Sequence, residues 1–125
     1  MDAAKGLAHP ARLRLLGMLA SGELCVCQLT AVLELAPSTV SQHLSVLSQG
    51  GWVRERKEGK LVFYRLREDG PAALLLAPLR QLLAREPAIR QDLDLVGRLR
   101  RLDVAVLCAA DLDLVALGVR RPEAR

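Results

Sequence analysis

Two cysteines separated by one residue are the feature of this sequence best suited to chemistry. Cys25 and Cys27 flank a single valine, and the chain has one further cysteine, Cys108. A single free cysteine behaves as a small buried hydrophobe, whereas a close pair favours metal or thiol chemistry. If segment 24–33 is helical, the two side chains point roughly 200° apart. One ion could then bind both sulfurs only if this helical turn unwound. The unwound turn would lie beside the next helix.

Few side chains are available to complete a thiolate site. Thiolates alone favour soft ions, and no cluster of His, Asp or Glu joins the pair. His43 is interpreted as a phosphate or base contact, or as a neighbour of the core, rather than as a metal ligand. Cys108 is the candidate for a third sulfur. It equally suits a structural position, because it lies in the apolar run 104–110.

Segment 37–49 is predicted to be a helix with an unusual surface. Val40, Leu44 and Leu47 form a narrow apolar stripe, and most of the other residues are small, polar and uncharged. Ser and Thr form helices less well than Glu, Lys or Arg, but small hydroxyls allow close entry into a major groove, and Gln can bond an adenine edge. The DNA contacts predicted here are Ser38, Thr39, Ser41, Gln42, His43 and Ser45. The alternative is a serine-rich surface helix that binds nothing.

The surrounding elements favour DNA binding. Residue patterns predict helices at 11–20, 24–33, 37–49 and 72–84, more helix from residue 89, and strands at 52–57 and 61–66. The tight turn at 34–36 makes the second and third helices a helix-turn-helix, and the strands form a basic hairpin beside it. The phosphate contacts predicted on the hairpin are Arg54, Arg56, Lys57, Lys60 and Arg65. The alternative is a solvated edge strand guarded by charge.

Composition limits the class of protein. The chain has 125 residues, 51% of them hydrophobic, and 18 Lys plus Arg against 14 Asp plus Glu, with a net charge of +4. This predicts a mostly α fold with a β-hairpin, divided into a winged helix-turn-helix domain with a dimerisation helix at 1–85 and a helical extension with a frayed tail at 86–125. Three cysteines are too few for a disulfide scaffold, so we expect reduced thiols and a cytoplasmic location. No signal peptide is expected. Acidic residues interrupt the apolar stretch 102–119, which excludes a membrane span there.

The motifs together resemble the ArsR/SmtB family of winged-helix metal-sensing repressors, the arsenic-responsive branch in particular. The resemblance covers about residues 5–68 and rests on five segments: His9–Leu13, Glu23–Cys27, Ser38–Leu47, Gly50–Val53 and Gly59–Leu66. It implies a homodimer on a palindromic DNA operator that leaves the DNA when metal binds. It also implies that Cys25 and Cys27 supply inducer thiolates. Trivalent arsenic and antimony, the inducers expected, prefer three thiolates.

The chain departs from the family pattern in ways that reduce the number of inducers expected to bind. Thr30 stands where some arsenic sensors have a further cysteine. We expect no cysteine-bearing N-terminal extension like that of the cadmium and lead sensors, because the first predicted helix begins close to Met1. No histidine follows His43, so the zinc site of the last helix is absent. The expected site is therefore Cys25 and Cys27, with Cys108 as the third ligand if the C-terminal helix folds back within a subunit or across the dimer.

The sequence thus predicts a repressor without a prosthetic group, induced by arsenite or antimonite. Six leucines of the 72–84 helix exceed what one small core needs, so this helix and the first should form the dimer interface: Leu74, Leu75, Leu76, Leu79, Leu82 and Leu83. The rival is a thiol-redox or persulfide sensor. A Cys25–Cys27 ring is strained, but a Cys25–Cys108 bridge is possible. A thiol enzyme such as an arsenate reductase is not expected, because neither a phosphate-binding loop nor a βαβ pattern surrounds the thiols.

Overall fold

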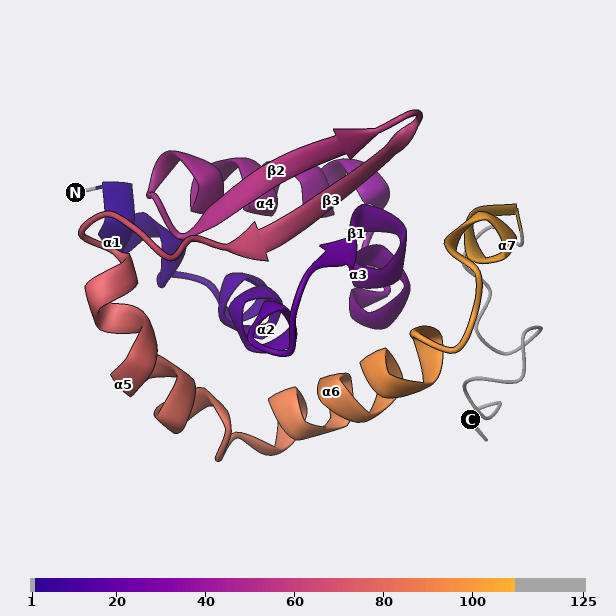
Figure 1. The fold of residues 1–125 in the computed structure, drawn as a ribbon. Helices are drawn as coiled ribbons and strands as arrows, with labels where there is room; N and C mark the ends of the chain where they lie inside the picture. Colours follow the sequence, from indigo (N-terminus) through magenta and orange to yellow (C-terminus); the bar gives the residue numbers. More distant parts are fainter. Residues whose placement is uncertain (1, 110–125) are drawn as a thin grey trace.

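Helices surround a small antiparallel sheet in the protein. The computed structural model describes residues 2–109. The elements are α1 (Asp2–Gly6), α2 (Pro10–Leu19), β1 (Leu24–Cys25), α3 (Val26–Leu33), α4 (Pro37–Gln49), β2 (Val53–Glu58), β3 (Leu61–Leu66), α5 (Ala73–Leu83), α6 (Pro87–Leu99) and α7 (Val104–Ala109) (Figure 1). This is the winged helix-turn-helix expected from the sequence. The predicted helices at 11–20, 37–49 and 72–84 are confirmed to within one residue at each end.

Local chemistry sets several helix boundaries. Proline occupies the first turn of α2, α4 and α6, where its fixed φ suits a helix and its missing N–H costs no hydrogen bond. The Nδ1 atom of His9 accepts a hydrogen bond from the Ala11 N–H, 3.0 Å away, and so caps α2. Glu34 ends α3 in the left-handed region with φ 57°, which produces the tight turn into α4.

The sheet has three strands rather than the two of the predicted hairpin. Its order is β1-β3-β2 with both pairs antiparallel, and Cys25 lies opposite Phe63. The prediction of a helix from residue 24 was therefore wrong at its start, because Leu24 and Cys25 are extended and α3 begins at Val26. The reason is tertiary: the backbone of these two residues pairs with β3, a partner nearly 40 residues further along the chain.

The core is mostly aliphatic, with Trp52 and Tyr64 as its buried aromatic members. The side chains of Leu15, Leu29, Leu44 and Trp52 are completely buried. The short helix α1, which the sequence did not predict, packs against α4. A Cβ atom at Gly6 would lie 2.6 Å from the Trp52 ring, so glycine allows α1 to approach this ring.

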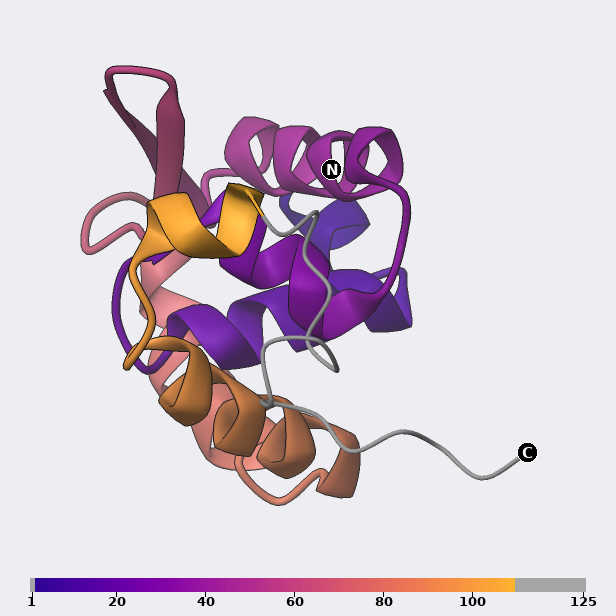
Figure 2. The same ribbon diagram turned by 90° about the vertical axis from the view of Figure 1, so that its right-hand side faces the viewer.

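Helix α6 packs on the side of the helical core opposite α4, and α7 packs beside the core (Figures 1 and 2). Helix α6 contacts α2 and α3, and α7 contacts α3. Arg14 of α2 holds Asp92 of α6 through two hydrogen bonds of 2.8 Å. The predicted frayed tail and most of the 102–119 stretch lie outside the described residues. In the part of the chain described, no helix is long and apolar enough to span a membrane.

Candidate nucleic-acid interface and thiol site

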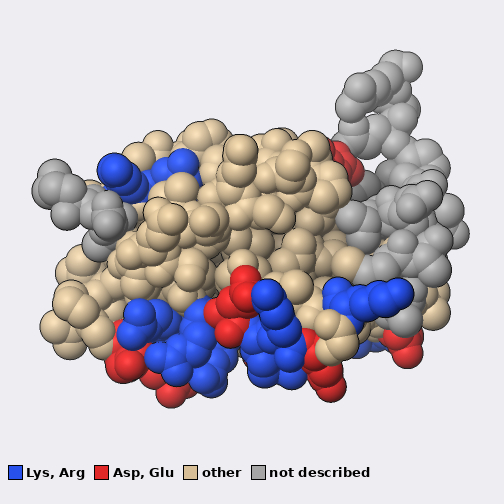
Figure 3. Space-filling model, turned by 90° about the horizontal axis from the view of Figure 1, so that it is seen from above, with Lys and Arg blue, Asp and Glu red and all other residues tan. Residues whose placement is uncertain are grey.

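Helix α4 presents a polar, uncharged face to solvent. Val40, Leu44 and Leu47 are completely buried and anchor the helix to the core. Of the residues predicted to contact DNA, Ser38, Ser41, Gln42 and Ser45 are exposed, and Thr39 is half-exposed. Figure 3 shows the charged side chains gathered along one edge of this face and its centre almost free of charge. The face can therefore approach another surface closely without first stripping water from charged groups.

His43 differs from its neighbours on α4 because its side chain is 9% exposed and turned toward α2. Its Nδ1 atom accepts a hydrogen bond of 3.1 Å from the Nε of Arg12, and its ring centroid lies 4.5 Å from that of His9. Burial, together with the nearby His9 and Arg12, lowers the pKa of His43. The placement is that of a core neighbour, one of the two roles considered for it, and a base contact would require this side chain to leave its position.

The hairpin separates the predicted phosphate contacts between its two faces. Arg54 and Arg65 lie directly opposite each other, and Arg56 lies on the same face two residues along β2. Lys57 lies on the other face, and Lys60 is in the turn. All five side chains belong to exposed residues. The two lysines and the three arginines therefore cannot all meet one flat surface, and the tip is the part of the hairpin that both groups can reach.

Arg56 joins the hairpin to the cysteine segment. Its guanidinium lies 2.6 Å from Glu23, 3.1 Å from Glu58 and 4.6 Å above the Phe63 ring. The hydrogen bond from Arg56 lowers the pKa of the Glu23 carboxyl. Glu23 immediately precedes β1, so this ion pair and the β1–β3 pairing both connect the segment that carries Cys25 to the hairpin. No local sequence pattern predicts this ion pair, because its members lie 33 residues apart.

Cys25 and Cys27 stand on different elements, which corrects the picture of two cysteines on one helix. Cys25 is in β1, 1% exposed, and its backbone N–H donates to the Oε1 of Gln28 at 2.8 Å. Cys27 lies in the first turn of α3 and is half-buried. An ion bound to both sulfurs would therefore join a buried strand residue to a half-buried helix residue, and not two positions of one regular helical turn.

The two cysteines also differ in their covalent state. Cys25 is free, whereas Cys27 is disulfide-bonded. The bridge that the sequence suggested through Cys25 is therefore not the one present. Helix α7, which contains Cys108, packs against α3, which contains Cys27. Among the described side chains, which do not include that of Cys108, no three His, Cys, Asp or Glu residues gather as a metal site.

Comparison with known proteins places this geometry in a family. The profile of bacterial regulatory proteins of the arsR family matches residues 9–55, from the cap of α2 into β2. The solved structure of HlyU from Vibrio cholerae is 37% identical, covers 67% of this chain and 90% of its own, and superposes with a TM-score of 0.59. The chain belongs to the arsR family. Members and relatives of this family are transcriptional regulators rather than enzymes.

Other relatives of this arsR-family protein carry different functional names. A biofilm growth-associated repressor of Agrobacterium fabrum is 51% identical over 73 residues, which is 58% of this chain and 62% of that protein. An arsenic resistance transcriptional regulator of Pseudomonas putida is 43% identical over 68 residues, or 54% of this chain and 53% of that protein. The chain thus spans between about half and three-fifths of these two relatives. Membership of the family does not by itself select an inducer.

Proposed function

We propose that this arsR-family protein is a transcriptional repressor that binds operator DNA through α4 and the tip of the β2–β3 hairpin. The observation that carries the proposal is the exposed, uncharged polar face of α4 above a completely buried apolar stripe. Such a helix can lie deep in a major groove, where Gln42 and the hydroxyls of Ser38, Thr39, Ser41 and Ser45 meet base edges. His43 supports the helix from below through Arg12.

The hairpin supplies the electrostatic part of the proposed interface. Lys57 and Lys60 at the tip are well placed to contact phosphates, because the tip extends beyond the helices in Figure 2. Arg54, Arg56 and Arg65 lie on one face of the hairpin, where Arg56 is engaged by Glu23 and Glu58, and Arg54 lies 3.4 Å from Asp69. We expect the two lysines and Arg65 to contribute most to phosphate binding, because none of their charges is held by a short ion pair among the described residues.

A homodimer is proposed to present two such surfaces to a palindromic operator. Three leucines on the outer side of α5 are strongly exposed: Leu74 at 81%, Leu75 at 54% and Leu82 at 64%. A row of exposed leucines on one helix marks a surface that another apolar surface should cover. A second copy of this chain satisfies that need symmetrically and places two α4 helices on one DNA duplex.

The inducer proposed first is trivalent arsenic or antimony, bound by Cys25, Cys27 and Cys108. The three thiols lie on β1, α3 and α7, and the helices α3 and α7 are in contact. Because Cys25 is buried opposite Phe63, joining the site is proposed to move it from this position. That displacement would break the β1–β3 pairing, and it would reach the hairpin through Glu23 and Arg56. It would also disturb the start of α3, the first helix of the helix-turn-helix.

A second candidate, a thiol-redox switch, is favoured by the disulfide at Cys27. The pair proposed is Cys27 with Cys108. Hydrogen peroxide would oxidise the two thiols to one disulfide. The two electrons and two protons that the thiols lose would reduce the hydrogen peroxide to two molecules of water. In this version Cys25 takes no part, and it remains a buried strand residue.

The two candidates are separated by DNA binding measured on single-cysteine variants. Fluorescence anisotropy of DNA from the upstream region of the gene is titrated with reduced protein, and arsenite or hydrogen peroxide is then added. The proteins compared are the wild type, Cys25→Ser, Cys27→Ser and Cys108→Ser. Arsenite binding predicts that Cys25→Ser weakens arsenite-driven release, whereas the redox switch predicts that Cys25→Ser still responds fully to peroxide.

The outcomes of these titrations decide between the two thiol mechanisms and also test DNA binding itself. Loss of the arsenite response in all three variants supports a three-thiolate site. Peroxide-driven release that needs Cys27 and Cys108 but not Cys25, without any arsenite response, establishes the redox switch instead. Tight DNA binding that neither reagent changes removes both thiol mechanisms but leaves the repressor. Absence of sequence-selective DNA binding by the reduced wild type contradicts the proposed function itself.

A further inference from the structure

A cleft of about 660 Å³ lies apart from helix α4, from the hairpin tip and from the three cysteines, and it shares Arg65 with the predicted phosphate contacts. Its walls are the C-terminal half of β3, the end of α2 and one side of α5. On α5 the wall residues are Ala73, Leu76, Ala77 and Arg80, which recur at helical spacing. The exposed Leu82 lies on the other side of that helix, whereas the exposed Leu74, three residues before Ala77, borders the cleft wall. Its volume falls within the range typical of small-molecule sites, about 300–1,000 Å³.

The floor of the cleft is apolar and its rim is basic. Leu19 and Leu76, 2% and 6% exposed, form part of the floor, together with the half-buried Leu66. The charged residues lining the cleft are Arg65, Arg67, Arg80, Glu23 and Glu68. This combination of apolar floor and charged rim is the usual architecture of a site for a small amphiphilic molecule.

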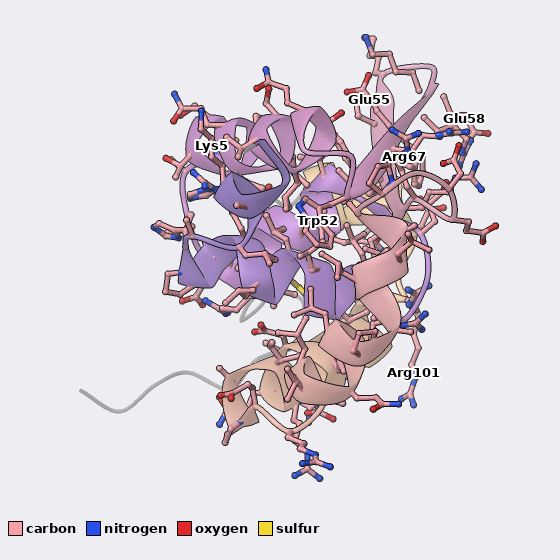
Figure 4. All side chains as sticks on the ribbon, turned by 90° about the vertical axis from the view of Figure 1, so that its left-hand side faces the viewer. Lys5, Trp52, Glu55, Glu58, Arg67 and Arg101 are labelled. Atoms are coloured by element: carbon pink, nitrogen blue, oxygen red, sulfur yellow. The ribbon has the colours of Figure 1, made fainter. Side chains whose placement is uncertain are left out.

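The charges at the rim do not cancel. Glu23 is held by Arg56 at 2.6 Å, and Arg67 by Asp69 at 3.1 Å. Figure 4 shows Arg67 beneath the hairpin, close to the beginning of α5. Among the described residues, neither Arg65 nor Arg80 has a carboxylate within ion-pair distance. Arg65 also helps to lower the pKa of Glu23, so the rim carries three arginines against two carboxylates.

Two further observations indicate that positive charge is concentrated at this rim. Arg65 lies directly opposite Arg54 across the strands, an arrangement of like charges that is destabilising by itself. Arg80 donates from its guanidinium to the carbonyl oxygen of Ala20 at 3.0 Å, which holds this side chain across the space between α5 and α2. That acceptor is neutral, and it leaves the charge and the other N–H groups of Arg80 available.

We propose that this cleft binds a small organic carboxylate with an apolar body. The carboxylate would lie between Arg65 and Arg80, since a planar guanidinium can donate two hydrogen bonds to it, and the apolar body would lie on Leu19, Leu66 and Leu76. This inference goes beyond the proposed response to arsenic or oxidants and does not depend on it. Because the cleft joins β3 of the hairpin to α5, a bound carboxylate would touch both the DNA-binding element and the proposed dimerisation helix.

The test uses the full chain, reduced and without DNA, and octanoate as the probe. Isothermal titration calorimetry should give saturable binding of one octanoate per chain, while octylammonium of the same length should not bind. Arg80→Gln should weaken octanoate binding by about tenfold or more, the loss expected for one charge-assisted hydrogen bond. The matched control is Arg90→Gln, which removes an exposed arginine from α6, away from the cleft, and should leave binding unchanged.

A second variant tests the location without changing any charge. Ala77→Phe should fill the cleft from α5 and abolish octanoate binding, whereas Gln81→Phe, at an exposed position that does not line the cleft, should not. Circular dichroism and the thermal unfolding midpoint confirm that each variant is folded. Absence of saturable octanoate binding at millimolar concentration would overturn the proposal, as would binding that Arg80→Gln and Ala77→Phe both leave unchanged, or equal binding of octylammonium.

Discussion

At the scale of single residues, a boundary between two elements gives neighbouring cysteines different properties. Cys25 ends β1 and is buried, while Cys27 opens α3 and is half-buried and disulfide-bonded. Two residues of the same type, one residue apart, therefore differ in access to solvent and in the partners that they can reach. The proposed division of labour, with Cys25 needed for arsenic but not for oxidation, follows from this difference.

Thr30 leads to the first prediction. Its side-chain oxygen is the only described buried side-chain nitrogen or oxygen without a hydrogen-bond partner, and the residue is 4% exposed. Valine has nearly the same shape without the hydroxyl, so Thr30→Val should raise the free energy of unfolding by about 1 kcal/mol. Urea unfolding followed by circular dichroism measures this change.

A control for Thr30 exists on the next helix. Thr39 is half-exposed, so its hydroxyl can bond water, and Thr39→Val should change the free energy of unfolding by less than about 0.5 kcal/mol. If Thr30→Val instead destabilises the protein by a kilocalorie per mole or more, the hydroxyl has a partner in solution and the argument from its isolation is wrong.

His43 gives a prediction about pH. Its folded-state pKa is lowered by burial, by His9 and by Arg12, so the unfolded chain binds a proton more readily than the folded protein. The contribution of neutral His43 to stability is therefore complete above its ordinary pKa, near 6.5, and declines as the pH falls through that value toward the folded-state pKa. Thermal unfolding at pH 7.5 and 5.5 should show a loss of stability that is smaller in His43→Gln, and an equal loss in both proteins would refute this assignment.

At the scale of elements, α6 is held against α2 by packing and by one ion pair whose carboxylate is buried. Gly17 of α2 has no Cβ, and one placed there would lie 2.6 Å from Ile89 of α6, so glycine permits this close packing. Near it, Asp92 of α6 is bound by Arg14 of α2, with their side chains 4% and 33% exposed, respectively. Removal of Arg14 should therefore change the stability of the protein by a different amount from removal of Asp92.

The asymmetry of this ion pair is the third prediction. Arg14→Ala should destabilise the protein by about 3 kcal/mol, because it leaves a buried carboxylate without a partner. Asp92→Ala should cost only about 1 kcal/mol, because the arginine can turn into water. Arg98→Ala, which removes the exposed Arg98–Asp94 pair within α6, is the control and should cost about 0.5 kcal/mol or less. Urea unfolding of the three variants gives the order, and equal costs for Arg14→Ala and Asp92→Ala would contradict it.

The same scale shows which elements can be predicted from sequence. Helices α2, α4 and α5 have apolar residues at helical spacing and clear stop signals, so their positions follow from local chemistry. Strand β1 has only two residues, Leu24 and Cys25, and forms because β3 offers a free edge, which no local pattern reveals. The same limit left the orientation of His43 open between a DNA contact and a core neighbour, since the polar spacing of α4 suits a surface position equally well.

At the scale of the whole molecule, the proposed surfaces point in different directions. Helix α4 and the hairpin tip lie at one side of the molecule, and α6 lies at the opposite side (Figures 1 and 2). The exposed leucines of α5 occupy a further surface, which reaches the edge of the carboxylate cleft at Leu74 and turns away from it at Leu82. DNA and a second subunit could therefore bind at the same time, whereas a carboxylate in the cleft would compete with DNA phosphate for Arg65.

Dimerisation is the prediction that belongs to this scale. The double variant Leu74→Asp, Leu82→Asp places two charges on the exposed apolar side of α5, where a partner surface could not solvate them. Sedimentation velocity at micromolar concentration should show a dimer for the wild type and a monomer of the 13.6 kDa chain for the variant. Operator binding should weaken by about a hundredfold or more, because two linked half-site contacts become one. Gln91→Asp, which adds a charge at an exposed position of α6, should remain dimeric and bind DNA normally. A wild type that is monomeric at micromolar concentration, or a leucine variant that remains dimeric, would show that the exposed leucines of α5 serve another purpose.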